Sequence, residues 1–405
     1  MSRAWVWWIL LAALLPRSLF AQLDPEYRRL IQIGYNQPLE GRAPVAAYGF
    51  YYYNNPNFIN TNMVLRLAVA PIYMDGELGF KGLFGEHTDL GVGFAGGGFA
   101  DTYSEIRGGS YLREESFTGH SAEVSSSVYH LLNPDWRVPA WWIGRMILHH
   151  GIYERDSKTA DDFEIPDDLT TVRLRAGFRA GGREPSLTSP LAFEISLWYE
   201  AHIRDGSQQY GYNNDREVKN ASHSFWTRGL LKYTFEESQQ YFDVNMILGA
   251  SIDADRFSAY RLGGMLPFVS EFPLSIPGYY YQEISADKFA LLNGEYSFPF
   301  TPNKNWRINL YGAIAVVDYL PGQEEPENWH SGLGAGITYV SPRGAWLASL
   351  VYGYGFRAIR HDDYGANQIG LLFQYDFDAA NRYRFRRFEP HLTPYGSKAG
   401  EKIFR

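Results

Sequence analysis

The segment FEISLWYEAHIR, residues 193–204, alternates between apolar and polar side chains. Phe193, Ile195 and Leu197 take odd positions, and Glu194 and Ser196 lie between them. Successive side chains of a β-strand point to opposite faces, whereas a helix repeats about every 3.6 residues. The segment therefore predicts a strand with one apolar face and one polar face.

The same pattern recurs over residues 172–180 and 242–253. In a soluble sandwich the apolar faces cover one another, whereas in a membrane barrel they face lipid and the polar faces line the lumen. Strand lengths near ten residues favour the second fold, an all-β transmembrane antiparallel barrel. We count about sixteen candidate strands, an even number as in bacterial single-chain barrels. The first covers residues 43–54, the eleventh 256–264 and the last 367–377.

The first residues predict a secretory signal peptide. Arg3 precedes an apolar run, Ala4–Leu15, that is too short to cross a membrane as a helix, and cleavage is expected after Ala21. The chain has no cysteine, 17% aromatic residues and a formal net charge of −8. This charge argues against nucleic acid as a partner, which calls for a basic surface. An exported chain of such strands is expected in the bacterial outer membrane, with outer-membrane lipids and lipopolysaccharide as partners.

The chain divides into segments of different character. In the second segment, Asp24-Pro25 is a good start for a short helix that plugs the lumen or lies beneath it. The last segment has seven Lys or Arg against three Asp or Glu, a balance of +4. It is either a solvated extension or a contact for anionic lipid or a periplasmic protein partner. The predicted segments are a signal peptide (1–21), a short N-terminal segment (22–42), the barrel (43–377) and a basic periplasmic tail (378–405).

Several motifs in residues 255–377 resemble a known family through their order. Beginning at Arg256, the chain reads RFSAYRLGGMLPF, and farther along come NWRINLYGAIAVVDYLPG, GLGAGITYVSPRGAWLASLVYGYGF and NQIGLLFQYDF. This order resembles the C-terminal barrel half of the BamA/TamA superfamily, the bacterial surface antigen family. The resemblance implies a sixteen-stranded outer-membrane barrel for protein insertion or translocation. Because few residues precede the first predicted strand, we expect this barrel to lack the periplasmic POTRA domains of larger relatives.

The stretch SIPGYYYQEISADKFALLNGEYSFPF, residues 275–300, corresponds to an external loop that folds into the lumen in that family. The family's loop tip carries an Arg-Gly-aromatic motif whose arginine pairs with an acidic residue on strand thirteen. Pro277, Gly278 and Tyr279 take the place of this motif, so the glycine and the aromatic residue match but the arginine does not. The resemblance thus implies an inward loop held in a different way.

Asp318 matches the family's acidic position. Asp318 lies an even number of residues after Ile314 and Val316, so strict alternation along the strand places all three on the lipid face. Either a bulge near Val317 turns it inward, or it lies above the membrane at the strand end. The loop could instead be held by its own acidic residues. In that case Glu283 or Asp287 would pair with a luminal arginine such as Arg173, Arg175 or Arg307.

The last predicted strand resembles the barrel-assembly signal of outer-membrane proteins. Gln368 supplies the polar residue, Gly370 the glycine, and Phe373 and Tyr375 the hydrophobic residues of that signal. Phe377 would serve as the terminal aromatic residue, although this chain continues beyond it.

No constellation of catalytic residues is recognisable. His149-His150 lie near the end of a predicted strand and His120 precedes Ser121, but neither has an acidic orienter at a recognisable spacing. We therefore expect no enzyme, no catalytic residue, no metal and no cofactor. The predicted function is protein or lipid insertion or translocation at the outer membrane. The alternatives are a passive diffusion channel for small solutes and a structural barrel that recruits a periplasmic partner.

Overall fold

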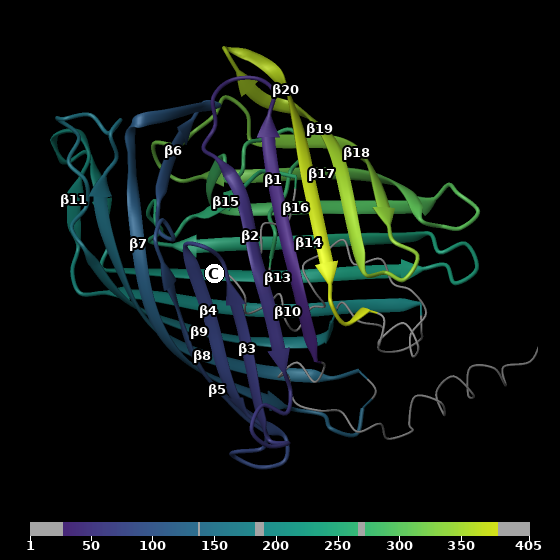
Figure 1. The fold of residues 1–405 in the computed structure, drawn as a ribbon. Coiled ribbons are helices and arrows are strands. Elements are labelled where there is room, and N and C mark those ends of the chain that lie inside the picture. Colours follow the sequence, from purple (N-terminus) through teal and green to yellow (C-terminus); the bar gives the residue numbers. More distant parts are fainter. Residues whose placement is uncertain (1–26, 137, 183–189, 266–271, 380–405) are drawn as a thin grey trace, which may run out of the picture.

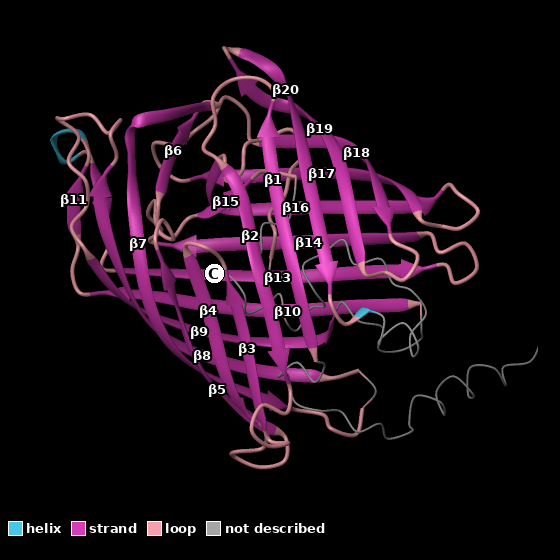
Figure 2. Cartoon of the chain, in the orientation of Figure 1, coloured by secondary structure: helices cyan, strands magenta, loops and turns pink. Residues whose placement is uncertain are grey.

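A computed structural model describes residues 27–136, 138–182, 190–265 and 272–379. The predicted signal peptide and almost all of the basic tail lie outside these residues. The described chain forms a closed antiparallel barrel of sixteen strands (Figures 1 and 2). A search of the described helices finds none that has the length and apolarity to cross a membrane. In barrel order the strands are β1 (Arg28–Pro38), β2 (Ala46–Asn55), β3 (Met63–Val69), β4 (Tyr73–Phe80), β5 (Thr88–Gly97), β7 (Ser110–Leu131), β8 (Ala140–Arg155), β9 (Leu169–Gly182), β10 (Leu191–Arg204), β13 (Ala221–Thr234), β14 (Tyr241–Ile252), β16 (Ile284–Pro299), β17 (Trp306–Tyr319), β18 (Trp329–Val340), β19 (Trp346–Arg360) and β20 (Asp363–Asp376).

The two faces of the wall differ as the alternation predicts. On β10, Ile195 and Leu197 are exposed on the outer face, where a membrane barrel meets lipid. Glu194 points inward, is fully buried and accepts hydrogen bonds from Arg228 of β13 at 2.5 and 3.0 Å. The lumen is therefore lined by paired charges, and the outer surface is apolar.

The barrel begins earlier than the sequence pattern predicted. Residues 28–38, placed in an N-terminal segment with a short helix, form strand β1 instead. β1 pairs with β2 and with β20 over nine residue pairs each, and so closes the barrel. Without β1, both β2 and β20 would leave an open strand edge in lipid, where unpaired backbone groups are costly. The plug-helix interpretation of this segment is wrong for the described residues.

The predicted strand at 256–264 is also wrong. Only Tyr260–Leu262 forms a strand, β15, which pairs briefly with β16 and spans nothing. Gly263 and Gly264 then adopt positive φ angles of 130° and 90°, which turn the chain away from the wall. The predicted total of sixteen agrees with the structure because β1 replaces this strand.

A cap covers the end of the barrel where the long connections lie, which we assign to the cell exterior. It contains β6 (Tyr103–Arg107), β11 (Gln208–Tyr210), the short helix η1 (Tyr212–Asn214) and β12 (Arg216–Val218). Glu105 is fully buried at its centre and accepts hydrogen bonds from Gln323 and Arg256. Phe163, from the acidic connection 156–168, is also fully buried. The hydrogen bonds of Glu105 join three external connections above the lumen.

Candidate functional site: the inward-folded loop

The described parts of the connection between β15 and β16, residues 263–265 and 272–283, fold into the lumen. Phe272 packs against Trp198 of β10 and Trp226 of β13, with ring centroids 5.8 and 5.7 Å apart. Farther along, Tyr279 is fully buried and hydrogen-bonds His330 of β18 at 3.1 Å. The described parts of this loop therefore contact two separate regions of the inner wall.

The tip of the loop lies directly on a glycine surface formed by β18 and β19. Gly278 has a φ of 86°, and a Cβ added there would lie 1.8 Å from the backbone nitrogen of Gly355. A Cβ on Gly332 would lie 2.2 Å from the carbonyl oxygen of Pro277. Such distances leave no room for a side chain at these positions. The glycines in the stretch 332–356 therefore allow the backbone of the loop to approach the wall.

A buried ion pair, which we call the loop clamp, joins the loop to β19. Both oxygens of Glu283 accept hydrogen bonds from Arg360, at 2.6 and 2.9 Å. The two side chains are only 1% and 2% exposed. Glu283 also accepts from the backbone N–H of Tyr280, whose ring lies 3.5 Å from the guanidinium carbon of Arg360. A bidentate, stacked and desolvated arginine is among the stronger ways to hold a segment in place.

The loop clamp has the opposite polarity to the arrangement that the resemblance implied. There the loop supplies arginine and the wall supplies acid, whereas here the loop supplies Glu283 and the wall supplies Arg360. Asp318 remains on the outer face, as its parity indicated, and pairs with Lys288 at 3.1 Å. The register irregularity lies on β16 between Ala286 and Lys288, not near Val317. The structure therefore contradicts a luminal role for Asp318.

The prediction that a loop acid pairs with a luminal arginine named the wrong arginines. Arg175 pairs with Glu200, Arg173 lies near Glu123, and Arg307 donates to Ser297 and to the carbonyl of Gln239. Asp287 accepts a hydrogen bond from Ser251. Arg360 was missed because strict alternation along β19 would place it outward. A register shift between Gly355 and Ile359 reverses the parity and turns Arg360 inward.

The loop also contacts both strands at the seam where the barrel closes. Gln368 of β20 donates to the carbonyl of Tyr279 at 2.6 Å and accepts from the N–H of Gly278 at 3.2 Å. Tyr280 donates to the carbonyl of Glu40, two residues after the end of β1. The carboxylate of Glu40 in turn accepts from the backbone and side chain of Asn367 on β20. The loop tip thus joins the two strands at their extracellular ends.

The seam itself lies between β1 and β20. Its nine pairs include a side-chain hydrogen bond of 3.0 Å between Gln32 and Gln374. It is not the junction with the fewest pairs, because β2 and β3 share only five. Opening the seam would therefore require the exchange of a complete ladder.

The other residues of the assembly-like signal lie along β20. Gly370 faces the lumen beside Gln368, whereas Phe373, Tyr375 and Phe377 are exposed on the outer face. Phe377 packs against Tyr375, with ring centroids 4.9 Å apart. Their part in barrel assembly stays a prediction.

His149 has partners that its sequence neighbourhood did not reveal. Its Nε2 lies 2.7 Å from Asp101 and its Nδ1 lies 3.3 Å from Glu123. Among the hydrogen bonds of the described chain, none links this ring to a hydroxyl that could act as a nucleophile. His150 points outward and contacts Thr170, while His120 lies 3.8 Å from Glu154. The search for groups of three or more metal-ligating residues in the described chain found none.

Comparison with known proteins shows that this chain resembles solved structures in fold. No protein-family model matches the sequence, and no curated protein does. CdiB from Acinetobacter baumannii superposes with a TM-score of 0.61 at 10% identity, over 87% of this chain and 60% of that one. CdiB from Escherichia coli gives 0.57 at 11% identity, over 87% and 63%. BamA from Haemophilus ducreyi lacking POTRA domains 1–3 gives 0.55 at 11% identity, over 87% and 71%.

The chain thus spans less than two thirds of the two CdiB chains. None of the three proteins is named as an enzyme. The closed sixteen-stranded wall, its apolar outer face and these superpositions agree. The described chain is a closed β-barrel with the fold of the BamA and CdiB barrels.

Proposed function

We propose that this barrel inserts or translocates protein or lipid at the outer membrane, and that its wall opens at the β1–β20 seam. The observation that carries the proposal is the contact of one loop tip with both sides of that seam. Gln368 holds the tip on the β20 side, and the carbonyl of Glu40 holds it on the β1 side. Withdrawal of the loop would remove both contacts at once.

The backbone ladder explains what would open the seam. In lipid, each unpaired N–H or C=O group costs several kcal/mol, so nine pairs do not separate without replacement. An incoming strand could supply the replacement pairs one by one, as in β-augmentation. A substrate that brings its own strand edge is therefore the kind of client that this seam suits.

The test is a reversible crosslink across the seam. The chain has no cysteine, so the pair Gln32→Cys and Gln374→Cys would supply its only thiols. Vesicles that hold this variant are mixed with a small, urea-unfolded outer-membrane barrel, and folding of the client is followed by its heat-dependent shift on gels. We expect the reduced protein to accelerate folding and the oxidised protein to lose the effect.

A second cysteine pair serves as the matched control. Ser297→Cys and Asn309→Cys join β16 to β17 at facing luminal positions away from the seam. Crosslinking this pair should leave the acceleration intact. Equal acceleration by the oxidised and reduced seam variants would contradict opening at the seam, and no acceleration by either would contradict insertion of this client class.

A diffusion channel is the second candidate. The observation that favours it is a luminal cavity of about 420 Å³ beside the loop, lined by Arg173, Arg204 and Arg261 among others. Such a cavity would suit small anions if it belonged to a continuous path. Conductance of the intact barrel separates the two functions.

A further inference from the structure

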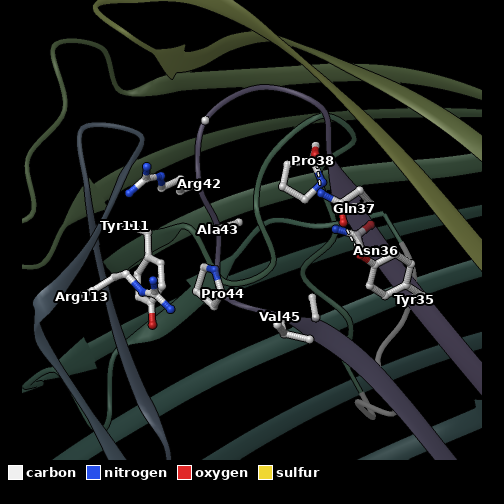
Figure 3. A pocket seen from close by; sticks show the side chains of 12 residues that line it. Tyr35, Asn36, Gln37, Pro38, Arg42, Ala43, Pro44, Val45, Tyr111 and Arg113 are labelled. Atoms are coloured by element: carbon white, nitrogen blue, oxygen red, sulfur yellow. Dashed lines mark hydrogen bonds between the residues drawn. The ribbon is translucent and has the colours of Figure 1, made fainter. Parts of the chain in front are cut away.

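A second cavity, of about 270 Å³, lies at the extracellular end of β1 and β2. Its lining comes from the end of β1, from the connection 41–45, and from Tyr111 and Arg113 near the start of β7. Figure 3 shows Arg42 and Arg113 on the side of the β6–β7 hairpin, and Tyr35 and Asn36 on β1. Gly41, which also lines the cavity, lies close to Tyr280 and Arg360 of the loop clamp.

The hairpin that carries Arg113 is fixed across the top of the barrel. Its turn contains Gly109, where an added Cβ would lie 1.8 Å from the carbonyl oxygen of Ile359 on β19. The hairpin thus reaches from β7 over to the β19 side, and Arg113 is brought to the connection that follows β1. Two arginines from separate parts of the sequence therefore line one cavity.

Both arginines are exposed, and neither forms an ion pair within the residues that the structure describes. Asn36 on the same cavity is only 2% exposed, yet its amide oxygen and nitrogen have no hydrogen-bond partner among the described atoms. Buried side-chain amides normally have partners. A ligand that accepts hydrogen bonds from the two arginines and from the amide would complete the site.

We propose that this cavity binds the phosphate group of a lipid headgroup in the outer leaflet. Guanidinium groups match phosphate oxygens in geometry and charge, and the Asn36 amide adds a donor at the buried end. The position of the cavity in the barrel wall indicates that the phosphate belongs to a membrane lipid. Asn36 faces the lumen whereas Tyr35 and Gln37 lie on the outer face, so the cavity is lined from both sides of the wall. Val45 on its rim is 88% exposed and apolar.

The apolar surroundings continue along the outer face below the cavity. Ile33 of β1 and Tyr51 of β2 are 51% and 36% exposed there, as expected for side chains that contact acyl chains. A headgroup in the cavity would leave its acyl chains beside these residues. The site requires neither seam opening nor client insertion, so it stands apart from the proposed function.

Native mass spectrometry of the full chain in detergent tests the site. The protein is titrated with phosphatidic acid, which carries a phosphate monoester, and separately with phosphatidylcholine. We expect preferential retention of phosphatidic acid, and at least about tenfold weaker binding by the Arg42→Gln/Arg113→Gln variant. Asn36→Ala should weaken binding with both arginines present. A heat-shift gel confirms that each variant is folded.

The charge-matched control is Lys304→Gln/Arg343→Gln, which removes two cations from periplasmic turns and should bind as the unmodified protein does. Equal retention of the two lipids by the unmodified protein, or unchanged binding by the double-arginine variant, would overturn the proposal. Soluble glycerol phosphate should bind much more weakly than phosphatidic acid. Equal affinity for the two would overturn the assignment to a lipid.

Discussion

The guanidinium of Arg360 and the carboxylate of Glu283 are both almost completely removed from solvent. A buried charge that loses its partner is left without compensation, because water cannot reach it. The same loop depends on a backbone conformation that only glycine adopts easily at position 278. Individual residues therefore decide whether the loop stays in the lumen.

Replacing Arg360 by Met should weaken the inward position of the loop by about 3–5 kcal/mol, because Glu283 would stay buried without its partner. Chymotrypsin cleavage after Tyr279 and Tyr280 measures this, since both rings are fully buried in the inward loop. The control is Arg357→Met, which removes an exposed arginine that pairs with Glu327 at 3.1 Å. Cleavage of both variants at the same slow rate would contradict the role of the loop clamp.

Gly278→Ala should also expose the loop. The left-handed backbone costs a residue with a Cβ about 1–2 kcal/mol, and the added atom would collide with the backbone of Gly355. Gly206→Ala is the control, because an added Cβ there has no atom within 4 Å. Limited proteolysis of the two variants gives the comparison, and full protection of the Gly278 variant would show that the tip tolerates a side chain.

Glu325, in the external connection after β17, should make the loop sensitive to pH. Burial raises the pKa of Glu325 to about 8; nearby Glu283 adds to the shift and Arg360 opposes it. A carboxyl with a raised pKa keeps its proton while the loop is inside. The inward state is therefore expected to weaken as the pH rises from about 5 to about 8, and to change no further above that range.

Single-channel recordings across this pH range would measure the effect as more frequent openings at higher pH. Glu325→Gln cannot ionise and should give openings that do not vary with pH. The same pH dependence in that variant would assign the titration to another group.

At the scale of elements, strand β1 and the irregularity in β19 decide how the barrel closes and where the loop is held. β1 forms backbone hydrogen bonds with both of its neighbours, so closure of the barrel depends more on its backbone groups than on its side chains. In β19 the register shift after Gly355 changes which side chains face inward. The irregular residues 356–358 thus place Arg360 opposite Glu283.

Ile33→Pro should prevent closure of the barrel, because proline removes a backbone donor from the middle of β1 and lipid supplies no substitute. Loss of the heat-dependent shift on gels after refolding into detergent would report this. Ile33→Ala keeps the backbone N–H and should retain the shift. A proline variant that closes normally would mean that β1 is dispensable.

On the scale of the whole molecule, the described parts of the inward loop and the cap both lie at the exterior end of the lumen. The loop contacts the walls formed by β10 and β13 and by β18 and β19, while Glu105 holds the external connections together. These contacts support a closed resting state. The exterior end is therefore the place where the state of the barrel would be controlled.

Planar-bilayer conductance should show the intact barrel closed and the Arg360→Met barrel conducting, because the loop leaves the lumen when its clamp is lost. Arg357→Met again serves as the control and should remain closed. Steady pores in the intact protein would instead support the diffusion channel. A closed Arg360→Met barrel would indicate that other contacts suffice to hold the loop.

The sequence by itself determined the fold class. The alternation at 193–204 and in similar segments fixes which face is apolar, because side chains alternate along any strand wherever it lies. It did not reveal β1, since RRLIQIGY is short and follows a good helix start. Only the unpaired edges of β2 and β20 make it a strand.

The candidate site was harder to predict from the sequence than the fold class was. The proline-glycine turn at 277–278 could be predicted from the sequence, because the conformation of a turn depends on residues that are adjacent in the chain. The partner of Glu283 was not, because it depends on a register shift in a strand far along the chain. The luminal arginines named from the sequence all have nearer partners. Tertiary structure alone decided the loop clamp and the seam contacts, because both join residues whose distance in space is set by closure of the barrel.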